Sequence, residues 1–586
     1  MLLTSPSASP PRPGRAVGIH SLFSGLHSRC LDFRVNVAAS SLPGRISRLG
    51  DARCELLGFC ADRRIRTYRR EGCNRMEFSR RKALKLGGVG VAAFGFSGRQ
   101  AASAAPDPVV ATTGQGAVRG VRDGEVIVWK GVRFAEAPTG EYRFAPPRPA
   151  RRWDGIRDAT EFGPEPFQAA KSGRSPAALP QAEDCLFLNV YSRSTDGRRP
   201  VIVWITGGGF MSGAGSQYDG AVYPRRQDVV FVTVNYRVNT FGYLYQPDRP
   251  GSGNLGLLDQ IAALRWVRDN ITAFGGDPDN VTVMGESAGG MSIGILLGTP
   301  AAKGLFRRAI VQSGGSCPTV MPEGKDYTTT AVLRAVGLGE NDAAKLIDVP
   351  APDLLAAATR VHQRADDADP RSAPFHPLID HVVLSRHPLD LIGDDVDLLV
   401  GTCDKEQIPG PTWESQFEFN LRHAAGDEGW NRLLKAYTET SAPGRDPRLD
   451  LLASAFVDMP STWLAERASH AGAQVWQYTF DYADAGRAGA LHGTDVPFTF
   501  GAPTPEMLAP GADPAVAQQL ADRMVDAFSA FAKTGDPATP ALPPWPAFTP
   551  QDRATLSFDT NPHITNDRLP ARRREAWAGI NPYTIC

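Results

Sequence analysis

A serine flanked by glycines is the strongest chemical signal in the 586-residue chain. Residues 285–289 read G-E-S-A-G and lie between an apolar run, Val281–Met284, and small residues suited to the start of a helix. This context predicts a nucleophile elbow, in which a strand ends, the chain turns sharply and a helix begins. Glycines two residues to either side lack the Cβ atoms that would clash in so tight a turn. Ser287 is therefore the predicted nucleophile, with Glu286 as an acidic neighbour.

A serine hydroxyl needs a base that takes its proton, and the base needs an acid that orients it. In such sites the acid and then the histidine follow the serine, each beyond the carboxyl end of a strand. The expected strand Leu398–Val400 is followed by Asp404 and Glu406, and the local pattern does not choose between them. His492 is the predicted base because it follows the expected strand Val475–Phe480 in a loop.

Other histidines after Ser287 fit a catalytic role less well. His423 and His470 fall in segments that look helical, where a surface histidine is the usual case, and His563 lies in a polar tail. His492 is followed by Gly493, which permits a tight turn.

A run of glycines predicts where the negative charge of an acyl-transfer transition state would be stabilised. The apolar stretch Val201–Ile205 continues into T-G-G-G-F at Thr206–Phe210. Consecutive glycines let the backbone approach a substrate closely, and the residue after the nucleophile supplies a further N–H group. We therefore expect the backbone N–H groups of Gly208, Gly209 and Ala288 to form an oxyanion hole.

The elements that must position these groups alternate between strands and helices. The apolar runs that predict buried strands are Val201–Ile205, Val229–Val234, Val281–Met284, Ala309–Val311, Leu398–Val400 and Val475–Phe480. Leu257–Asn270 has helical spacing of apolar residues. This order predicts the α/β class, with a mostly parallel sheet covered by helices on both faces. The helical-looking segments 320–373 and 413–471 are predicted cap insertions within one domain, residues 106–586.

Longer motifs give the chain a family resemblance from about Gly114 to Trp577. They are Glu183–Val190, Asn235–Arg237, Gly253–Gln260, Phe274–Pro278, the elbow, Gln312–Gly314 and His492–Asp495. With them the chain resembles the type-B carboxylesterase family, which contains bacterial para-nitrobenzyl esterases and, more distantly, cholinesterases. The resemblance implies an α/β-hydrolase fold, no cofactor and no metal. It also implies that Glu406 is the acid, because the glutamate of the family ends a G-T-x-x-x-E pattern, and that Ser313 supports this acid.

The chain departs from the family pattern at three places. Thr206 stands where the family has a histidine that braces the glycine loop, so we expect a looser oxyanion hole. Lys405 precedes Glu406 where the family has aspartate, and a lysine there competes for the carboxylate. Proline replaces the family cysteine in residues 162–166, which leaves Cys185 as an expected free buried thiol. We hypothesise a disulfide bridge between Cys317 and Cys403, since each follows an expected neighbouring strand.

The N-terminal region predicts export. Twin arginines in Ser79–Lys85 precede a short apolar stretch, Leu86–Phe96, and the A-x-A site within Ala101–Ala105. Residues 76–105 are therefore a predicted twin-arginine-type signal peptide. The apolar stretch is about half the ~20 residues that a membrane-spanning helix needs, so we expect no stable anchor. Residues 1–75 are interpreted as an over-long translation start before Met76, or else as a disordered extension.

These features together predict a secreted serine carboxylic-ester hydrolase. A formal net charge of zero gives no indication of a nucleic acid partner, and we expect a monomer or weak homodimer acting on small apolar esters. Aromatic residues near the motifs are candidates to line the pocket: Phe210, Trp413, Phe417, Phe419 and Phe498. A lactonase or amidase on the same site remains an alternative. So does a weakly active or non-catalytic binding protein of the same family.

Overall fold

The computed structural model describes residues 108–169, 179–315, 325–368, 375–408, 411–482, 489–504, 508 and 512–581. The predicted extension, 1–75, and the predicted signal peptide, 76–105, lie outside these residues. The same is true of Cys317 and Cys586.

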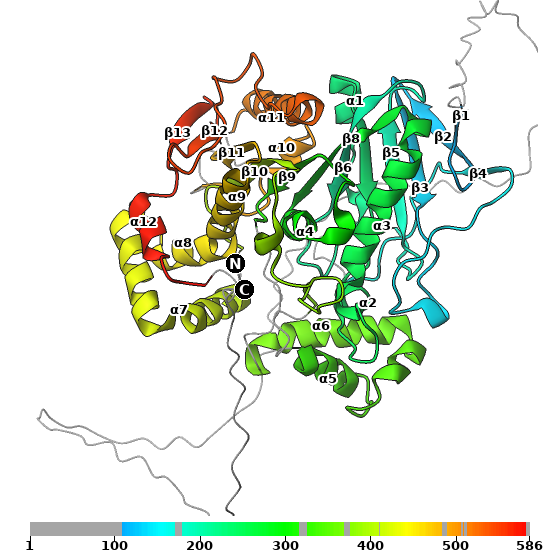
Figure 1. The fold of residues 1–586 in the computed structure, drawn as a ribbon, viewed down its shortest axis with the longest axis horizontal. Helices are drawn as coiled ribbons and strands as arrows, with labels where there is room; N and C mark the ends of the chain where they lie inside the picture. The colour runs from blue at the N-terminus through cyan, green and yellow to red at the C-terminus, as the bar shows by residue number, and fades with distance from the viewer. Residues whose placement is uncertain are drawn as a thin grey trace, which may run out of the picture. The chain divides into compact units, whose positions relative to one another are not determined.

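One large sheet forms the centre of the described chain (Figure 1). Its strands lie in the order β1 (Pro108–Thr112), β2 (Ala117–Asp123), β3 (Val126–Arg133), β5 (Phe187–Ser192), β7 (Val230–Val234), β6 (Arg199–Ile205), β8 (Gly276–Glu286), β9 (Arg308–Gln312), β10 (Asp397–Cys403), β11 (Val475–Phe480), β12 (Ala554–Phe558) and β13 (His563–Asn566). A short strand, β4 (Ile156–Asp158), pairs with β2. The strands from β7 to β12 run parallel, and the strands at both edges run antiparallel. Every strand predicted from an apolar run is present.

The helices occur mainly between the strands. They are α1 (Val222–Gln227), α2 (Asn239–Tyr243), α3 (Leu255–Asn270), α4 (Ala288–Leu297), α5 (Lys325–Ala335), α6 (Ala351–Ala368), α7 (Pro411–Thr440), α8 (Pro447–Ala453), α9 (Met459–Ala471), α10 (Val496–Thr499), α11 (Pro514–Thr534) and α12 (Ala571–Ala576). The helix predicted at Leu257–Asn270 is α3, which begins two residues earlier.

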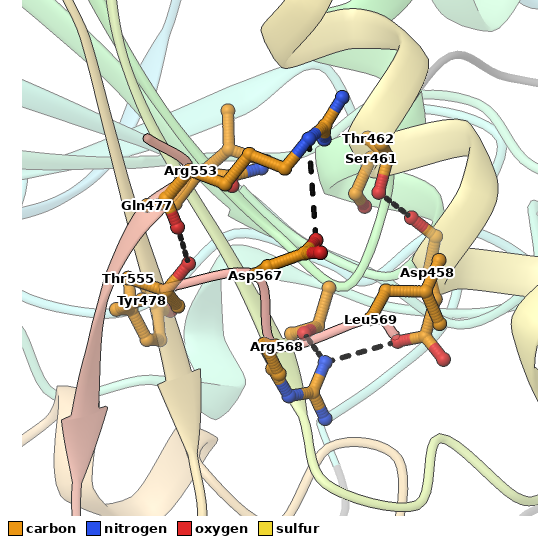
Figure 2. A pocket seen from close by; sticks show the side chains of 12 residues that line it. Asp458, Ser461, Thr462, Gln477, Tyr478, Arg553, Thr555, Asp567, Arg568 and Leu569 are labelled. Carbon is orange, nitrogen blue, oxygen red and sulfur yellow. Dashed lines mark hydrogen bonds and ion pairs between the residues drawn. The ribbon is translucent and has the colours of Figure 1, made fainter. Parts of the chain in front are cut away.

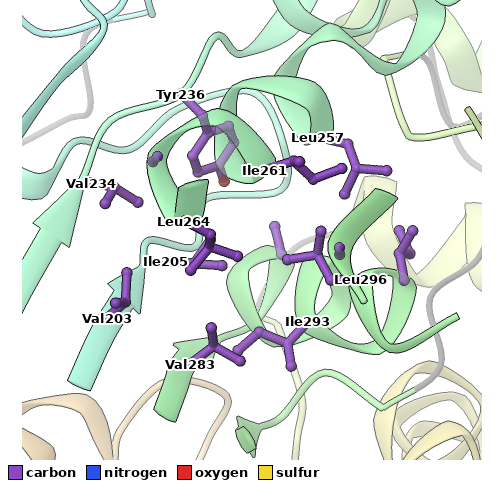
Figure 3. Packing of buried hydrophobic residues seen from close by; sticks show 14 of the residues in the cluster. Val203, Ile205, Val234, Tyr236, Leu257, Ile261, Leu264, Val283, Ile293 and Leu296 are labelled. Carbon is purple, nitrogen blue, oxygen red and sulfur yellow. The ribbon is translucent and has the colours of Figure 1, made fainter. Parts of the chain in front are cut away.

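Alternation along β6 shows why the sheet needs cover on both faces. Val203 and Ile205 belong to a core shared with α3 and α4, where Leu264 and Ile293 pack against them (Figure 3). Ile202 and Trp204 point to the opposite face, into a second core built mainly with α11. Because successive side chains of a strand point to opposite faces, a strand this apolar is stable only between two layers. The structure therefore has the α/β-hydrolase arrangement that the sequence predicts.

The two predicted insertions are helical. The first contains α5 and α6, and the second contains α7, α8, a π-helical turn at Ser454–Asp458, and α9. α7, α8 and α12 share a small core beside the sheet, to which the start of α9 adds Met459 (Figure 1). The rest of α9 packs on β10 and β11, so this helix also covers the sheet itself. None of the helices in the described residues is long and apolar enough to cross a membrane.

The two cysteines in the described residues are both unbridged. Cys185 and Cys403 are free thiols, and each is almost fully buried. The expectation for Cys185 is therefore confirmed. The hypothesised partner of Cys403, Cys317, lies outside the described residues, and within them the Cys403 thiol is unbridged and lies 3.9 Å from Thr494 Oγ1.

Candidate active site

The predicted site residues converge at the carboxyl ends of neighbouring parallel strands. β6 has β7 on one side and β8 on the other, so the connections that leave β6 and β8 turn in opposite directions. Open α/β sheets bind ligands in the crevice at such a point. The glycine loop follows β6, Ser287 follows β8, and Ser313 follows β9. Glu406 follows β10, and His492 lies in the connection after β11.

Ser287 occupies a strained backbone conformation between β8 and α4. Its φ is 56° and its ψ is −126°, values that L residues rarely adopt. Its N–H donates to the carbonyl of Gln312 at 3.0 Å, and its own carbonyl accepts from Met291 N at 2.8 Å. A Cβ atom on Gly289 would lie 2.0 Å from the carbonyl oxygen of Ile205. Glycine is therefore required where α4 passes the end of β6.

A continuous chain of hydrogen bonds links the predicted catalytic side chains. Nε2 of His492 lies 2.9 Å from Oγ of Ser287, and Nδ1 of His492 lies 2.6 Å from Oε2 of Glu406. Ser287 is partly exposed, whereas Glu406 is completely buried. The predicted nucleophile is thus within reach of a substrate, and the predicted acid is shielded from water.

The structure distinguishes between the two candidate acids. The second carboxylate oxygen of Glu406 accepts from Ser313 Oγ and from the backbone N–H of Cys403, each at 2.6 Å. Both carboxylate oxygens of Asp404 instead accept from Nη1 of Arg445, each at 3.0 Å. Among the described ion pairs, Glu406 pairs with His492 and not with Lys405. The Lys405 side chain lines a separate polar pocket beside Arg445.

Several carboxylates surround the imidazole of His492. Burial lowers the pKa of His492, but the hydrogen bond to Glu406 and the nearby charges of Glu286, Glu406 and Asp495 outweigh burial and raise it to about 9. Oε1 of Glu286 lies 3.4 Å from Nε2 of His492, on the side of the ring that faces Ser287. Asp495 is fully buried, and burial followed by the charge of Glu406 raises its pKa to about 6. This environment stabilises the imidazolium that forms when the ring accepts a proton.

The glycine loop presents its backbone beside the nucleophile. Gly208 has φ 120°, and a Cβ atom there would lie 2.3 Å from the carbonyl oxygen of Ser212. The Gly208 carbonyl accepts from the N–H groups of Met211 and Ser212, each at 3.1 Å. Within the described residues we find no acceptor bonded to the N–H groups of Gly208, Gly209 or Ala288. These three N–H groups are therefore available to a ligand.

Thr206 is held by two tyrosines that sequence reasoning did not single out. Its Oγ1 lies 3.1 Å from the hydroxyl of Tyr218 and 3.2 Å from the carbonyl of Gly207. The hydroxyl of Tyr236 donates to the Thr206 carbonyl at 2.7 Å. The ring of Tyr218 packs against Trp204. The first residue of the glycine loop is therefore hydrogen-bonded on both its side chain and its backbone.

The candidate pocket aromatics have different positions. Phe210 and Phe498 are core residues, since Phe210 packs on Tyr243 and Phe498 packs on Phe480. Phe419 is exposed and stacks on His423. The side chain of Trp413 lies outside the described residues.

Phe417 is the candidate that connects to the catalytic groups. Its ring meets that of Phe456 with centroids 4.9 Å apart, and Phe456 lies 5.2 Å from the His492 ring. Phe456 belongs to the π-helical turn, and nothing in the local sequence pattern indicated that it would meet His492.

Comparison with known proteins identifies the family of the chain. A model of the carboxylesterase family matches residues 106–577. A para-nitrobenzyl esterase from Bacillus subtilis (strain 168) is 37% identical over 488 residues, which make up 80% of this chain and 98% of that protein. A phenmedipham hydrolase from Pseudarthrobacter oxydans is 33% identical and covers 76% of this chain and 94% of that protein.

Solved structures show the same fold. The carboxylesterase of Geobacillus stearothermophilus at pH 6.2 has a TM-score of 0.71 at 36% identity, covering 80% of this chain and 99% of that chain. A structure of PNB esterase has a TM-score of 0.72 at 34% identity, with the same coverage. The fold is therefore that of the α/β-hydrolases. Within that class the chain belongs to the carboxylesterase family, and it is a carboxylic ester hydrolase.

Proposed function

We propose that the chain hydrolyses esters by two-step acyl transfer, with Ser287, His492 and Glu406 as the catalytic triad. The observation that carries this proposal is the unbroken chain of hydrogen bonds from Ser287 Oγ through His492 to Glu406. His492 takes the proton of Ser287 as the oxygen attacks the ester carbonyl, and it then protonates the leaving alcohol. Water attacks the acyl-enzyme in the second step, and His492 again accepts the proton.

The oxyanion rests on the N–H groups of Gly208, Gly209 and Ala288 in this proposal. Their lack of acceptors among the described residues supports it, because preformed donors need no reorganisation during the reaction. Removal of one such donor costs other hydrolases about 2.7–4 kcal/mol of transition-state stabilisation.

Glu406 holds the imidazole and stabilises the charged form that develops during attack. Ser313 and the Cys403 N–H keep the carboxylate in place from behind, which makes them supports and not reacting groups. Glu286 adds a second negative charge 3.4 Å from Nε2 of His492, so it stabilises the imidazolium on the side of the nucleophile.

The substrates proposed here are apolar carboxylic esters of modest size. The ring of Phe456 beside His492, with Phe417 packed on Phe456, supports an apolar lining near the proposed base. Residues 1–105 contain 18 Lys and Arg and 6 Asp and Glu, so the proposed mature chain, residues 106–586, has a formal net charge of −12 and disfavours strongly anionic esters at long range.

We also propose that the chain is exported through a twin-arginine-type signal at residues 76–105, and that the mature chain is a monomer or a weak homodimer. The twin arginines and the A-x-A site support export. The proposed catalytic groups all come from one chain, so the site is complete without a partner. N-terminal sequencing of protein from the cell exterior tests export, and a chain that retains residues 76–105 there would contradict it.

An ester panel on the mature protein tests the proposed chemistry. Acyl and alcohol lengths are varied, and Ser287→Ala is expected to lower kcat by at least about 10³-fold for every ester that the wild type turns over. Ser292→Ala is the matched control, because Ser292 lies one turn further along α4 and bonds to Ala288 O and Gln260. Equal turnover by Ser287→Ala and the wild type would overturn the assignment of the nucleophile.

A further inference from the structure

A small pocket of about 40 Å³, lined mainly by polar residues, lies against β10, β11 and β12, beside Asp458 of the π-helical turn (Figure 2). Ser287 and His492 are not among its lining residues. Two arginines line it, Arg553 and Arg568. The segment that carries Arg568 follows β13, far along the chain from the proposed catalytic groups. The pocket is therefore where the C-terminal part of the chain meets the strand end that carries the proposed acid.

Arg568 bonds to the turn that holds Glu406. Its Nη1 donates to Thr402 Oγ1 at 2.7 Å, and its Nη2 donates to the carbonyl of Cys403 at 2.9 Å. The N–H of the same Cys403 donates to Glu406 at 2.6 Å. The backbone of Cys403 thus lies between the guanidinium on one side and the proposed catalytic carboxylate on the other.

The same guanidinium also bonds to the π-helical turn. Nη1 of Arg568 lies 3.2 Å from Oδ1 of Asp458, the last residue of that turn (Figure 2). The other Asp458 oxygen accepts from Ser454 Oγ at 2.8 Å, across the turn. Phe456 lies between these two residues, and its ring contacts the His492 ring. π-Helical turns occur frequently at functional sites.

We propose that Arg568 is a positioning residue for the proposed triad, which fixes the Glu406 turn and the Phe456 wall of His492 relative to each other. It touches neither Ser287 nor His492, so it acts through Cys403 on the acid and through Asp458 on the ring that packs against the base. This role rests on the proposed assignment of Glu406 and His492.

The geometry requires arginine at position 568. The acceptors are a threonine hydroxyl, a backbone carbonyl and a carboxylate, and they come from β10 and from the π-helical turn. A planar guanidinium carries five donors in a fixed fork and stays charged, whereas a lysine ammonium is a single flexible point charge. Arg568→Lys therefore keeps the charge and loses the simultaneous contacts.

Arg553 offers a matched control in the same pocket. Its side chain is 14% exposed, against 23% for Arg568. It pairs with Glu466 and with Asp567, and it lies over the Phe548 ring. Among the described contacts of Arg553, none reaches the Glu406 turn or the π-helical turn. Arg553→Lys therefore reports what the loss of a pocket arginine does to folding alone.

The test compares kcat, KM and the pH profile of the full chain carrying Arg568→Lys or Arg553→Lys. We expect Arg568→Lys to lower kcat by about 10-fold to 100-fold with KM within about twofold, because small displacements of catalytic groups have effects of this size. A looser contact with Glu406 should give His492 a lower pKa than in the wild type. The acidic limb of the kcat/KM profile of Arg568→Lys should therefore lie at lower pH. Arg553→Lys should have the same kcat and the same acidic limb of the pH profile as the wild type.

If Arg568→Lys does not fold, Asp458→Asn tests the positioning role of Arg568 instead. It keeps the shape of the side chain and weakens only the link between Arg568 and the π-helical turn, so kcat should fall by about threefold to tenfold. Wild-type kcat and an unmoved pH limb in a folded Arg568→Lys, or in Asp458→Asn, would overturn the proposal. Glu406→Gln is measured alongside: if it too retains wild-type kcat, the triad assignment has failed, and if it alone loses kcat, only the role of Arg568 has failed.

Discussion

Non-glycine residues with left-handed backbones mark the ends of three adjacent strands in the site. Ser287, Ser313 and Glu406 have φ values of 56°, 48° and 43°, after β8, β9 and β10 respectively. Each such residue costs of order 1–3 kcal/mol and persists only where its surroundings hold it in place. Here the surroundings are the mutual hydrogen bonds: Ser287 N to Gln312, Ser313 N to Gly401, and Ser313 Oγ to Glu406. The strain places the three predicted site side chains together at the carboxyl ends of β8, β9 and β10.

The pair of Thr206 and Tyr218 gives a prediction at the same scale. Thr206→Val and Tyr218→Phe each remove one hydroxyl of a contact that holds the start of the oxyanion loop. We expect each variant to lower kcat by about 2-fold to 10-fold, the equivalent of one hydrogen bond of about 0.5–1.5 kcal/mol. Because the two hydroxyls contact each other, the double variant should cost less than the product of the single effects. Kinetics of the four proteins in a double-mutant cycle measure this coupling.

Tyr223→Phe is the control for that cycle. The Tyr223 side chain is fully buried in the neighbouring aromatic cluster, but its hydroxyl donates to the carbonyl of Thr499 and not to the loop. Its removal should leave kcat unchanged. Fully multiplicative effects of Thr206→Val and Tyr218→Phe would show that the loop does not depend on their contact.

Sequence analysis found the site residues whose positions are fixed by their neighbours in the sequence. It missed those whose positions depend on contacts with residues far away in the sequence. Ser287 could be predicted because its turn is encoded by glycines within the same five residues. Asp404 and Glu406 are only two residues apart, and what separates their roles is Arg445, which binds Asp404 from a distant loop. Tyr218, Phe456 and Arg568 carry no local signal, since each reaches the site only through tertiary packing.

At the scale of elements, the site depends on the close approach of α4 to the end of β6. The Gly289 backbone passes the Ile205 carbonyl so closely that a Cβ atom would lie 2.0 Å from that oxygen. Neither partner has room to move, because Ile205 belongs to the central parallel sheet and Gly289 to the first turn of the nucleophile helix.

Gly289→Ala is therefore expected to destabilise the fold by about 3 kcal/mol, the upper end of ordinary overpacking. The added methyl group must push α4 away from β6, so kcat should fall together with stability. The midpoint and slope of guanidinium unfolding measure the first effect, and the ester assay measures the second.

Gly304→Ala is the matched comparison for Gly289→Ala. Gly304 has φ 76°, and an added Cβ atom there would meet no atom within 4 Å. Its cost is limited to backbone strain of about 1 kcal/mol, with no effect on kcat. Equal unfolding midpoints for the two variants would show that the approach of α4 to β6 is not tight.

Elements were predictable where an apolar run is bounded by turn residues. β11 has the predicted bounds Val475–Phe480, and the predicted run at Val201–Ile205 is β6 with two further residues at its start. The π-helical turn was not predictable, because its extra residue leaves no mark on the apolar spacing of a helical segment. It is fixed by contacts across the turn and by Arg568.

For the whole molecule, the two cores on either face of the sheet leave the proposed base and acid in a largely buried, low-dielectric position. The His492 side chain is 10% exposed and the Glu406 side chain is 0% exposed. Charges interact more strongly there than in water, so the ionisation of the site affects the stability of the entire fold.

The pH dependence of stability follows from the direction of the His492 shift. Its pKa is raised in the folded chain from 6.5 to about 9, chiefly by Glu406 and Glu286 against the opposing effect of burial. The folded state therefore binds the proton more tightly than the unfolded state. The resulting stabilisation is fully present below pH 6.5 and is lost as the pH rises through about 9. Asp495 titrates with a pKa of about 6, so its contribution changes below this window.

Wild type and His492→Gln should therefore differ most in stability at pH 6.5 and least above pH 9. The raised pKa corresponds to a change of about 3 kcal/mol in their difference across this window. Guanidinium unfolding of both proteins at several pH values measures this difference, and groups that titrate alike in the two proteins cancel. A difference that stays constant from pH 6.5 to 9.5 would mean that the carboxylates around His492 do not hold its proton in the folded chain.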